Sequence, residues 1–485
     1  MNDMSSRRLS SRRDFLRVVG LGGLSMAALP ALNACGVGTG GGSSGAAKNG
    51  AADVTGSFDW KKAKGQKIKI LQTPHPYQQS FQPLLKEFTA KTGIEVTADL
   101  VPEADYFTKL NTELAGKSGE HDVFMTGAYF IWQYGPPGWM EDLKPWLQND
   151  SATSQEYAFD DIYEGLRTAT SWDFKPGSPL GTGGQWAIPW GFETNVVAYN
   201  KKLFDSKGWK LPTTWADFTT LCDTIKAAGI TPFGYAGANA SYYMVRALLT
   251  SAAKIGTEQC LIDIDNLKAG AWTADPIKKA AQAWGEIGNK YINKTFLGLK
   301  HTEVQLQQDQ DKLAFYPCGS WLENEQAKDT PPTFEYAVTP LPSVTTSDQL
   351  PATAINAAAG EIYFAAAKGK NPQGGKEYIR GMLSKEAALG FTKLTKSLTV
   401  VAGAADGQTI SPGLTSANDM LGKAGKDVFV GYLFDNWYKK LDDESRAAVN
   451  DLMFKGGDAN KFCQRMEAAS QAVAKDSSVT KFTRS

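Results

Sequence analysis

The chain has 485 residues, with 51 basic and 51 acidic side chains and a formal net charge of zero. This length is enough for about two or three domains with substantial cores, and the balanced charge gives no basic surplus for a nucleic-acid partner. The five cysteines and three histidines are widely scattered, without the paired spacing of a metal motif, so neither a metal ion nor a cofactor is expected.

The first residues combine an export signal with an attachment point. A pair of arginines, Arg12 and Arg13, precedes an uncharged apolar run over residues 18–31, and Cys35 follows small residues. The run is about 14 residues long, whereas about 20 are needed to span a bilayer as a helix, so it predicts a cleaved signal. The pattern resembles a twin-arginine signal of a bacterial lipoprotein. This resemblance implies a signal peptide over residues 1–34, lipid attachment at Cys35 and a position on the outer face of the cytoplasmic membrane.

The next segment, residues 35–56, is mostly glycine, serine and alanine, which predicts a flexible tether. A chain of this length and composition has a mean reach of about 25 Å. Such a tether would let a globular body move over the membrane from which it hangs. Regular structure is expected to begin near Lys67.

The segment from residue 68 to residue 96 has the pattern of a strand, a helix and a second strand, with Gly93 as the helix stop. Three such elements in about 30 residues form a βαβ unit, which predicts a largely parallel sheet. A further helix over residues 104–115 and a strand over residues 122–125 extend this unit.

The middle of the chain alternates strands and helices. Residues 185–199 are rich in strand formers and predict one long strand that crosses between two lobes. A capping box at residues 214–217 begins a helix whose apolar face includes Cys222, which is expected as a buried free thiol. Further helices are predicted over residues 243–253 and 275–291.

The last third begins with strands predicted over residues 334–338 and 355–364 and is then mostly helical. The predicted helices cover residues 373–383, 435–441, 444–454 and 460–474. The class is therefore α/β, with two lobes that each combine segments distant in sequence. The expected lobes are residues 57–190 with 350–395, and residues 191–349 with 396–485.

Several blocks resemble a known family. After the signal and the tether, residues 88–96 (FTAKTGIEV) and 189–201 (PWGFETNVVAYNK) resemble extracellular solute-binding proteins of sugar ABC transporters. A second set of blocks resembles the actinobacterial lipoproteins that bind N-acetylglucosamine and diacetylchitobiose: residues 235–237, 242–243, 265–267, 271–272, 319–325, 370–375 and 396–399. The resemblance implies a two-lobed periplasmic-binding-protein fold of type II, like maltose-binding protein, with a hinge and an inter-lobe cleft.

The resemblance also implies a function without bond breaking. A carbohydrate is captured as the lobes close, and the closed form is recognised by the permease subunits of an ABC importer. We expect a monomer, with N-acetylglucosamine or chitobiose as the first candidate ligand. Cys318 stands where relatives usually have asparagine, and the stretches around His75 and Trp190 match poorly, so another sugar remains open.

A sugar offers hydroxyl edges and apolar ring faces, so its receptor needs carboxylates or amides together with aromatic rings. Trp321 is the first candidate, since it follows a Gly-Ser turn, and Glu323 and Glu325 beside it can accept hydrogen bonds from hydroxyl groups. The alternatives are a core tryptophan and carboxylates that satisfy amides at a helix start. The other candidates lie near expected strand ends, loops or the lobe crossing: His75, Tyr77, Tyr129, Trp132, Trp190, Glu193, Tyr242, Tyr243, Glu361 and Trp437.

The sequence also leaves two other functions to consider, an exported enzyme and a receptor for a non-sugar solute. In an exported carbohydrate-active enzyme, Glu323 and Glu325 would have to flank one glycosidic bond, but residues two apart are poorly placed to do so from opposite sides. A receptor for a non-sugar solute such as a peptide remains open, because aromatic clefts are not unique to sugar receptors.

Overall fold

In the computed structural model, named helices and strands extend from Lys67 to Lys475. The residues described are 59–484 except 75, 128–130, 148–158, 176–177, 179–180, 321, 327–329, 359–360, 366–368 and 383. The predicted signal peptide, Cys35 and the tether lie outside the described residues. Within the described ranges, no helix is long and apolar enough to cross a membrane.

The first sheet has the strand order β2-β1-β3-β12-β6. Strand β1 (Lys67–Gln72) pairs in parallel with β2 (Glu95–Leu100) and β3 (Val123–Gly127), and α1 (Pro76–Thr92) and α2 (Glu103–Gly116) form the connections. These elements confirm the predicted βαβ unit and its extension. The unit is predictable because each strand and helix carries its own apolar pattern over a short stretch of chain.

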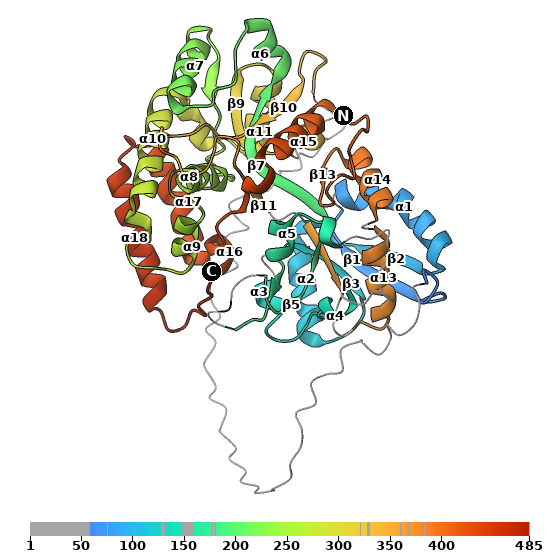
Figure 1. Cartoon of the computed structure of the whole chain (residues 1–485). Helices are drawn as coiled ribbons and strands as arrows, with labels where there is room; N and C mark the ends of the chain where they lie inside the picture. Colours follow the sequence, from blue (N-terminus) through green and yellow to red (C-terminus); the bar gives the residue numbers. More distant parts are fainter. Residues whose placement is uncertain are drawn as a thin grey trace, which may run out of the picture. The chain divides into compact units, whose positions relative to one another are not determined.

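The other two strands of this sheet come from later in the chain. Strand β12 (Glu361–Ala365) pairs antiparallel with β3, and β6 (Ile188–Pro189) pairs antiparallel with β12. Helices α13 (Pro372–Met382) and α14 (Lys385–Thr395) pack against α1, as Figure 1 shows where the orange and blue segments meet. The first sheet therefore combines the start of the described chain with a segment about 300 residues later.

The second sheet has the strand order β14-β11-β7-β9-β8. Its longest strand, β7 (Gly191–Asn200), pairs with β9 (Leu313–Gly319) along its second half, and every residue of β9 is buried. The remaining strands of this sheet are β8 (Thr231–Phe233), β10 (Tyr336–Thr339), β11 (Ile355–Ala358), β13 (Leu398–Thr399) and β14 (Val428–Val430). Strands β10 and β13 pair with β7 outside the main path.

Two predicted strands are wrong as single elements. Residues 185–199 divide into the end of β5 (Gly184–Gln185), which pairs with β4 (Ser171–Trp172), then β6 and β7. Residues 355–364 divide into β11 of the second sheet and β12 of the first. The apolar run carries no local mark of this change, because the sheet that a strand joins is decided by its pairing partners.

The change of sheet bears on the predicted lobes. The boundary predicted after residue 190 coincides with the step from β6 to β7. The boundary predicted at residue 350 does not coincide with a change of sheet, since β11 still belongs to the second sheet. We propose that this boundary lies between Ala358 and Glu361, while the residue ranges of the two lobes stay a prediction.

Helices pack around the second sheet, and α10 packs against α8, α17 and α18 on the left of Figure 1. The bounds are α6 (Lys201–Lys207), α7 (Trp215–Ala227), α8 (Tyr242–Gly256), α9 (Gln259–Asp265), α10 (Asp275–Tyr291), α11 (His301–Asp309), α12 (Leu322–Gln326), α15 (Pro412–Ala424), α16 (Phe434–Trp437), α17 (Lys439–Phe454) and α18 (Ala459–Lys475). Short helices of the earlier part are α3 (Ile131–Tyr134), α4 (Lys144–Leu147) and α5 (Glu164–Thr168). The predicted helix over residues 275–291 is confirmed with both of its ends.

Helix α7 confirms Thr214 as the predicted N-cap, but the Asp217 carboxylate accepts from the Thr214 hydroxyl and not from the Thr214 backbone N as in a capping box. The Thr214 hydroxyl accepts a hydrogen bond from the Asp217 backbone N at 3.2 Å and donates to the Asp217 carboxylate at 2.8 Å. Gly229 follows the helix with φ of 79°, as a helix stop requires. Cys222 is buried as a free thiol, as predicted, and its burial raises its pKa.

A close contact of helix α10 decides whether replacing Gly288 by alanine stabilises or destabilises the protein. A Cβ at Gly288 would lie 2.5 Å from the backbone O of Met453 and 2.7 Å from its Cα. Alanine stabilises a helix interior by about 1 kcal/mol over glycine, but forcing two backbones apart costs about 1–3 kcal/mol. We expect Gly288→Ala to lower the free energy of unfolding by up to about 2 kcal/mol, measured by urea denaturation.

The matched control for this substitution is Gly422→Ala in α15. A Cβ there meets no heavy atom within 4 Å, so only helix propensity acts. We expect this control to raise the free energy of unfolding by about 0.5–1 kcal/mol. If both substitutions stabilise the protein, the close contact between α10 and α17 does not limit packing.

Candidate functional site

The structure tests the predicted site residues unevenly. His75, Tyr129 and Trp321 lie outside the described residues. Four further candidates are placed by their backbone alone: Tyr77 in α1, Trp132 in α3, Glu193 in β7 and Glu361 in β12. Ligand contacts by these residues stay predictions.

Two of the predicted tryptophans lie in the hydrophobic core. Trp190 is 3% exposed and packs edge-on against Phe391, with ring centroids 5.9 Å apart. Trp437 is 7% exposed and packs against Phe482, with ring centroids 5.4 Å apart. This packing corrects the expectation that either indole offers a free face to a sugar, because neighbouring rings already cover them.

The predicted acceptor Glu323 has a different role from the expected one. Its side chain is nearly buried, and Oε2 accepts hydrogen bonds from Ser411 Oγ at 2.5 Å and Leu414 N at 3.2 Å. Both donors belong to the start of α15, so Glu323 satisfies one N-terminal amide and the N-cap hydroxyl of a helix distant in sequence. Sequence reasoning considered such a role only for the local helix.

Three of the predicted residues do come together. Tyr242 and Tyr243 begin α8, and the Tyr243 ring lies 5.3 Å from the ring of His301. His301 Nε2 lies 3.2 Å from the carboxylate of Glu325, and its Nδ1 lies 2.6 Å from the Tyr316 hydroxyl. Glu325 is 42% exposed, so this network of aromatic and polar groups reaches solvent at its carboxylate end.

A second cluster, which we call the arginine cluster, lies beside Tyr242. Its other members are Asn195 of β7, Arg246 of α8, Asp435 of α16, and Asp442 and Arg446 of α17. The guanidinium groups of Arg246 and Arg446 lie 5.0 and 4.8 Å from the Tyr242 ring centroid. Arg446 Nε donates to both carboxylate oxygens of Asp442, at 2.9 and 3.0 Å.

Arg246 is held more loosely than Arg446. Its Nη1 donates to Asn195 Oδ1 at 3.3 Å, and its Nη2 lies 4.0 Å from Asp435 Oδ2. The side chain of Arg246 is 27% exposed and that of Asp435 only 10%. Asp435 Oδ1 is buried and has no hydrogen-bond partner among the described residues. The cluster therefore contains donors and an acceptor that its own side chains do not saturate.

The local electrostatics follow from this burial. Burial raises the pKa of Asp435 to about 7, and Arg246 opposes this effect while Asp442 adds to it. Burial acts to lower the pKa of Arg246, but Tyr432 and Asp435 outweigh it, so that pKa is raised. Two arginines and two carboxyl groups give the ionised cluster no formal net charge.

Sequence reasoning missed Arg246 and Asp435. A signal was present for Arg246, because it interrupts a helix that is otherwise buried and apolar over most of its length. No comparable signal existed for Asp435. Its short helix is positioned by Asp265, whose Oδ1 accepts hydrogen bonds from Leu433 N at 2.8 Å and Phe434 N at 2.9 Å.

Comparison with known proteins decides the class. A family model described as bacterial extracellular solute-binding protein matches residues 72–389, which is more than half of the chain. The chain belongs to this family. The members are solute-binding proteins and not enzymes, which confirms that no catalytic function is to be sought in Glu323 and Glu325.

This solute-binding protein is similar to curated proteins over parts of their length. It is 68% identical over 215 residues to an erythritol/L-threitol-binding protein of Mycolicibacterium smegmatis, and the match covers 44% of each chain. It is 33% identical over 294 residues to a diacetylchitobiose binding protein of Streptomyces coelicolor, covering 59% of this chain and 61% of that protein. The chain therefore matches less than two thirds of either relative.

Solved structures confirm the fold of the solute-binding protein. A chitin oligosaccharide binding protein superposes with a TM-score of 0.66 at 17% identity, covering 84% of this chain and 98% of that one. A maltose-bound protein of T. maritima gives a TM-score of 0.64 at 15% identity, covering 84% and 100%. The predicted two-lobed type II periplasmic-binding-protein fold is thus confirmed.

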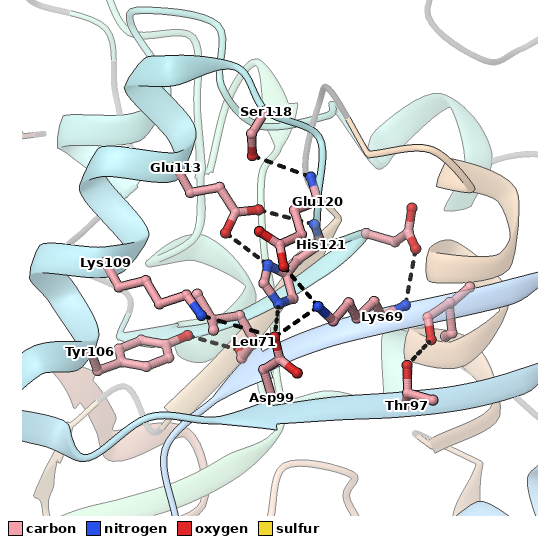
Figure 2. A network of polar contacts seen from close by, with 12 residues as sticks. Lys69, Leu71, Thr97, Asp99, Tyr106, Lys109, Glu113, Ser118, Glu120 and His121 are labelled. Atoms are coloured by element: carbon pink, nitrogen blue, oxygen red, sulfur yellow. Dashed lines mark hydrogen bonds and ion pairs between the residues drawn. The ribbon is translucent and has the colours of Figure 1, made fainter.

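The solute-binding protein also has a polar cluster away from these residues, shown in Figure 2. Ligand-type atoms of Asp99, Glu120 and His121 lie within 4.8 Å of one another. The Lys69 ammonium lies 2.9 Å from the Asp99 carboxylate and 2.8 Å from that of Glu120, and these hydrogen bonds raise its pKa. The ammonium thus stands where a cation would bind, and the cluster is best explained as an ion-pair network.

The buried part of this network fixes the His121 ring. Its Nδ1 lies 2.7 Å from Glu113 Oε2 and its Nε2 lies 3.1 Å from Asp99 Oδ2, while its backbone N donates to Glu113 Oε1 at 3.0 Å. These contacts join the end of α2 to the start of β3. The cluster therefore stabilises the first sheet and adds no residue to the candidate site.

Proposed function

We propose that the protein is the extracellular receptor of an ABC importer for a short, uncharged, polyhydroxylated solute, with a four-carbon sugar alcohol as the first candidate. The observation that carries this proposal is the 68% identity to an erythritol/L-threitol-binding protein, even though that match covers less than half of either chain. The arginine cluster supports it, because its unsaturated polar groups suit hydroxyl groups better than an apolar ring face.

A second candidate ligand is N-acetylglucosamine or its disaccharide chitobiose. The 33% identity to a diacetylchitobiose binding protein favours it, together with the tyrosine pair at the start of α8. A ligand with sugar rings needs apolar faces to stack on, and Trp321 remains the predicted residue for that contact. In this proposal a chitobiose ligand needs the Trp321 ring, whereas a four-carbon sugar alcohol does not.

The remaining parts of the proposal concern delivery. We place the protein at the outer face of the cytoplasmic membrane, held by a lipid on Cys35 and the tether over residues 35–56. In this proposal a monomer captures the solute between two lobes, and the closed form passes it to the permease subunits.

The experiment is thermal unfolding of residues 36–485 against erythritol, L-threitol, N-acetylglucosamine, chitobiose, raffinose and maltose. A solute that binds only the native state at a concentration of 100 times its Kd adds about 2.7 kcal/mol, so the unfolding midpoint rises. We expect the largest rise with erythritol or L-threitol.

The control variant is Trp321→Ala, whose effect separates the two candidates. For a four-carbon polyol we expect a small change in affinity, whereas a chitobiose receptor should lose most of its affinity without the indole. A rise with chitobiose alone would replace the first candidate by the second. No rise with any of the six compounds would overturn the proposed function.

A further inference from the structure

The contact between Arg246 and Asp435 is incomplete in a specific way. The guanidinium Nη2 and the carboxylate Oδ2 are 4.0 Å apart, which is beyond the 2.7–3.2 Å range typical of a hydrogen bond. The Asp435 side chain is nine-tenths buried, and its Oδ1 has no hydrogen-bond partner among the described residues. A buried acceptor of this kind is costly to leave unpaired, so the arrangement calls for a donor that comes from outside the chain.

Arg246 and Asp435 together restrict the chemistry of the group that could lie between them. Arg246 offers N–H donors and no acceptor, whereas an ionised Asp435 offers acceptors and no donor. One hydroxyl group can accept from the arginine and donate to the carboxylate, and both bonds are charge-assisted. Two hydroxyl groups on adjacent carbons can each donate a hydrogen bond to one of the two carboxylate oxygens.

We propose that Arg246 and Asp435 clamp a vicinal diol of the solute, and that this clamp selects uncharged polyols over the corresponding sugar acids. This inference rests on the proposed function and assigns residues to it.

The charge distribution around the clamp explains the selectivity. Arg446 is paired with Asp442 through two hydrogen bonds from its Nε, so Asp442 compensates its charge. Arg246 instead has the Asp435 carboxylate 4.0 Å from its Nη2. A carboxylate on the ligand would be attracted by Arg246 but repelled by the Asp435 carboxylate beside it. In a desolvated site this repulsion between like charges opposes binding. A neutral diol carries no charge that Asp435 would repel.

The neighbouring side chains hold the clamp in place. Tyr242 and Arg246 are four residues apart on α8, so they share a helix face, and the tyrosine ring supports the guanidinium at 5.0 Å. Asn195 of β7 fixes the other edge of the guanidinium at 3.3 Å. Asp435 is fixed by the amide contacts of Asp265 to Leu433 and Phe434.

The test is isothermal titration of residues 36–485 with erythritol and with erythronate, its four-carbon acid. Asp435→Asn keeps the size of the side chain but removes its charge. We expect erythritol to bind this variant about 10- to 100-fold more weakly, and the preference for erythritol over erythronate to fall by at least about 10-fold. The unfolding midpoint of the unliganded variant should stay level or rise, because a buried carboxylate has been removed.

The matched control is Asp443→Asn, an exposed carboxylate that pairs with Lys439 on the surface of α17. It should leave both affinities unchanged. If the wild-type protein binds erythritol and Asp435→Asn binds it equally well, the clamp is overturned while the receptor function stands. If erythronate binds the wild type as tightly as erythritol, the selectivity is overturned. If the wild type binds no compound of the panel, the failure lies with the proposed function.

Discussion

Replacing Arg484 by methionine is expected to lower the free energy of unfolding by about 3–5 kcal/mol. Arg484 is 3% exposed and its Nη1 donates to Asp265 Oδ2 at 2.8 Å and to Gly431 O at 2.5 Å, while Nη2 donates to Glu258 and to Val430 O. Asp265 is fully buried. Without the arginine, its charge would be left in the interior with no compensating cation.

A second substitution separates lost charge pairing from lost packing. Asn at position 265 still offers an oxygen to Leu433 N and Phe434 N but carries no charge. We therefore expect the double variant Arg484→Met with Asp265→Asn to recover at least half of the lost stability, measured by urea denaturation. An equal loss in the single and double variants would show that packing, not the buried charge, dominates.

The matched control for Arg484 is Arg465→Met. Arg465 also contacts two carboxylates, Glu444 and Asp451, but its side chain is 32% exposed. Because solvent screens such pairs, we expect this control to cost about 1 kcal/mol or less. A cost similar to that of Arg484→Met would contradict the role assigned to burial.

The Arg484 contacts also reach the candidate site. The Asp265 carboxylate that Arg484 neutralises is the group that positions the start of α16, which carries Asp435. A variant that weakens this link should lower solute affinity even at temperatures where the protein remains folded. Arg484 is therefore a positioning residue in our proposal and not a ligand contact.

The second large effect concerns Lys254, whose side chain is fully buried. Its Nζ donates to the backbone O of Leu341 and, at 2.8 Å, to that of Ala352. Burial lowers the pKa of Lys254 to about 7, and the Asp348 carboxylate partly opposes this. A neutral amine still has two N–H groups, one for each carbonyl, so the loss of the proton keeps both hydrogen bonds.

The lowered pKa makes stability rise with pH. Between about pH 7 and pH 10 the unfolded chain keeps the lysine proton while the folded protein has released it. In this window the unfolded state binds more protons, so the free energy of unfolding increases by about 1.4 kcal/mol per pH unit from this group. We expect the wild type to gain about 2–3 kcal/mol relative to Lys254→Met between pH 7 and pH 9.

Urea denaturation of both proteins at pH 7, 8 and 9 tests this expectation, since other titrating groups are common to the pair. The exposed Lys210, changed to methionine, is the control and should follow the wild type at every pH. Parallel pH profiles for the wild type and Lys254→Met would mean that Lys254 keeps its proton in the folded state.

Elements with a complete local pattern are predictable from the sequence, whereas pairings between distant segments are not. The βαβ unit and α10 follow from the sequence because their apolar periodicity and stop signals lie within a few turns of chain. Residues 355–364 show the opposite case. Their apolar run identifies extended chain, but β11 and β12 join different sheets through partners that lie elsewhere in sequence.

The candidate site also contains residues that the sequence identified and a residue whose role only the fold decided. The sequence predicted Tyr242, Tyr243 and Glu325 as separate candidates, and the structure links these residues through His301. Glu323 has equally suitable chemistry, yet a hydrogen bond from the Ser411 side chain gives it a structural role. A single sequence does not indicate which carboxylate a distant helix start will occupy.

The sequence by itself determined the class of this protein, because the blocks that resemble the family are read from consecutive residues and the family model matches residues 72–389. Only the tertiary structure decided which polar groups meet. Arg246 and Asp435 belong to helices far apart in the chain, and they are brought together because α8 and α16 both pack against α17. Burial and pairing depend on what surrounds a side chain in space, and these properties separate a ligand contact from a core residue.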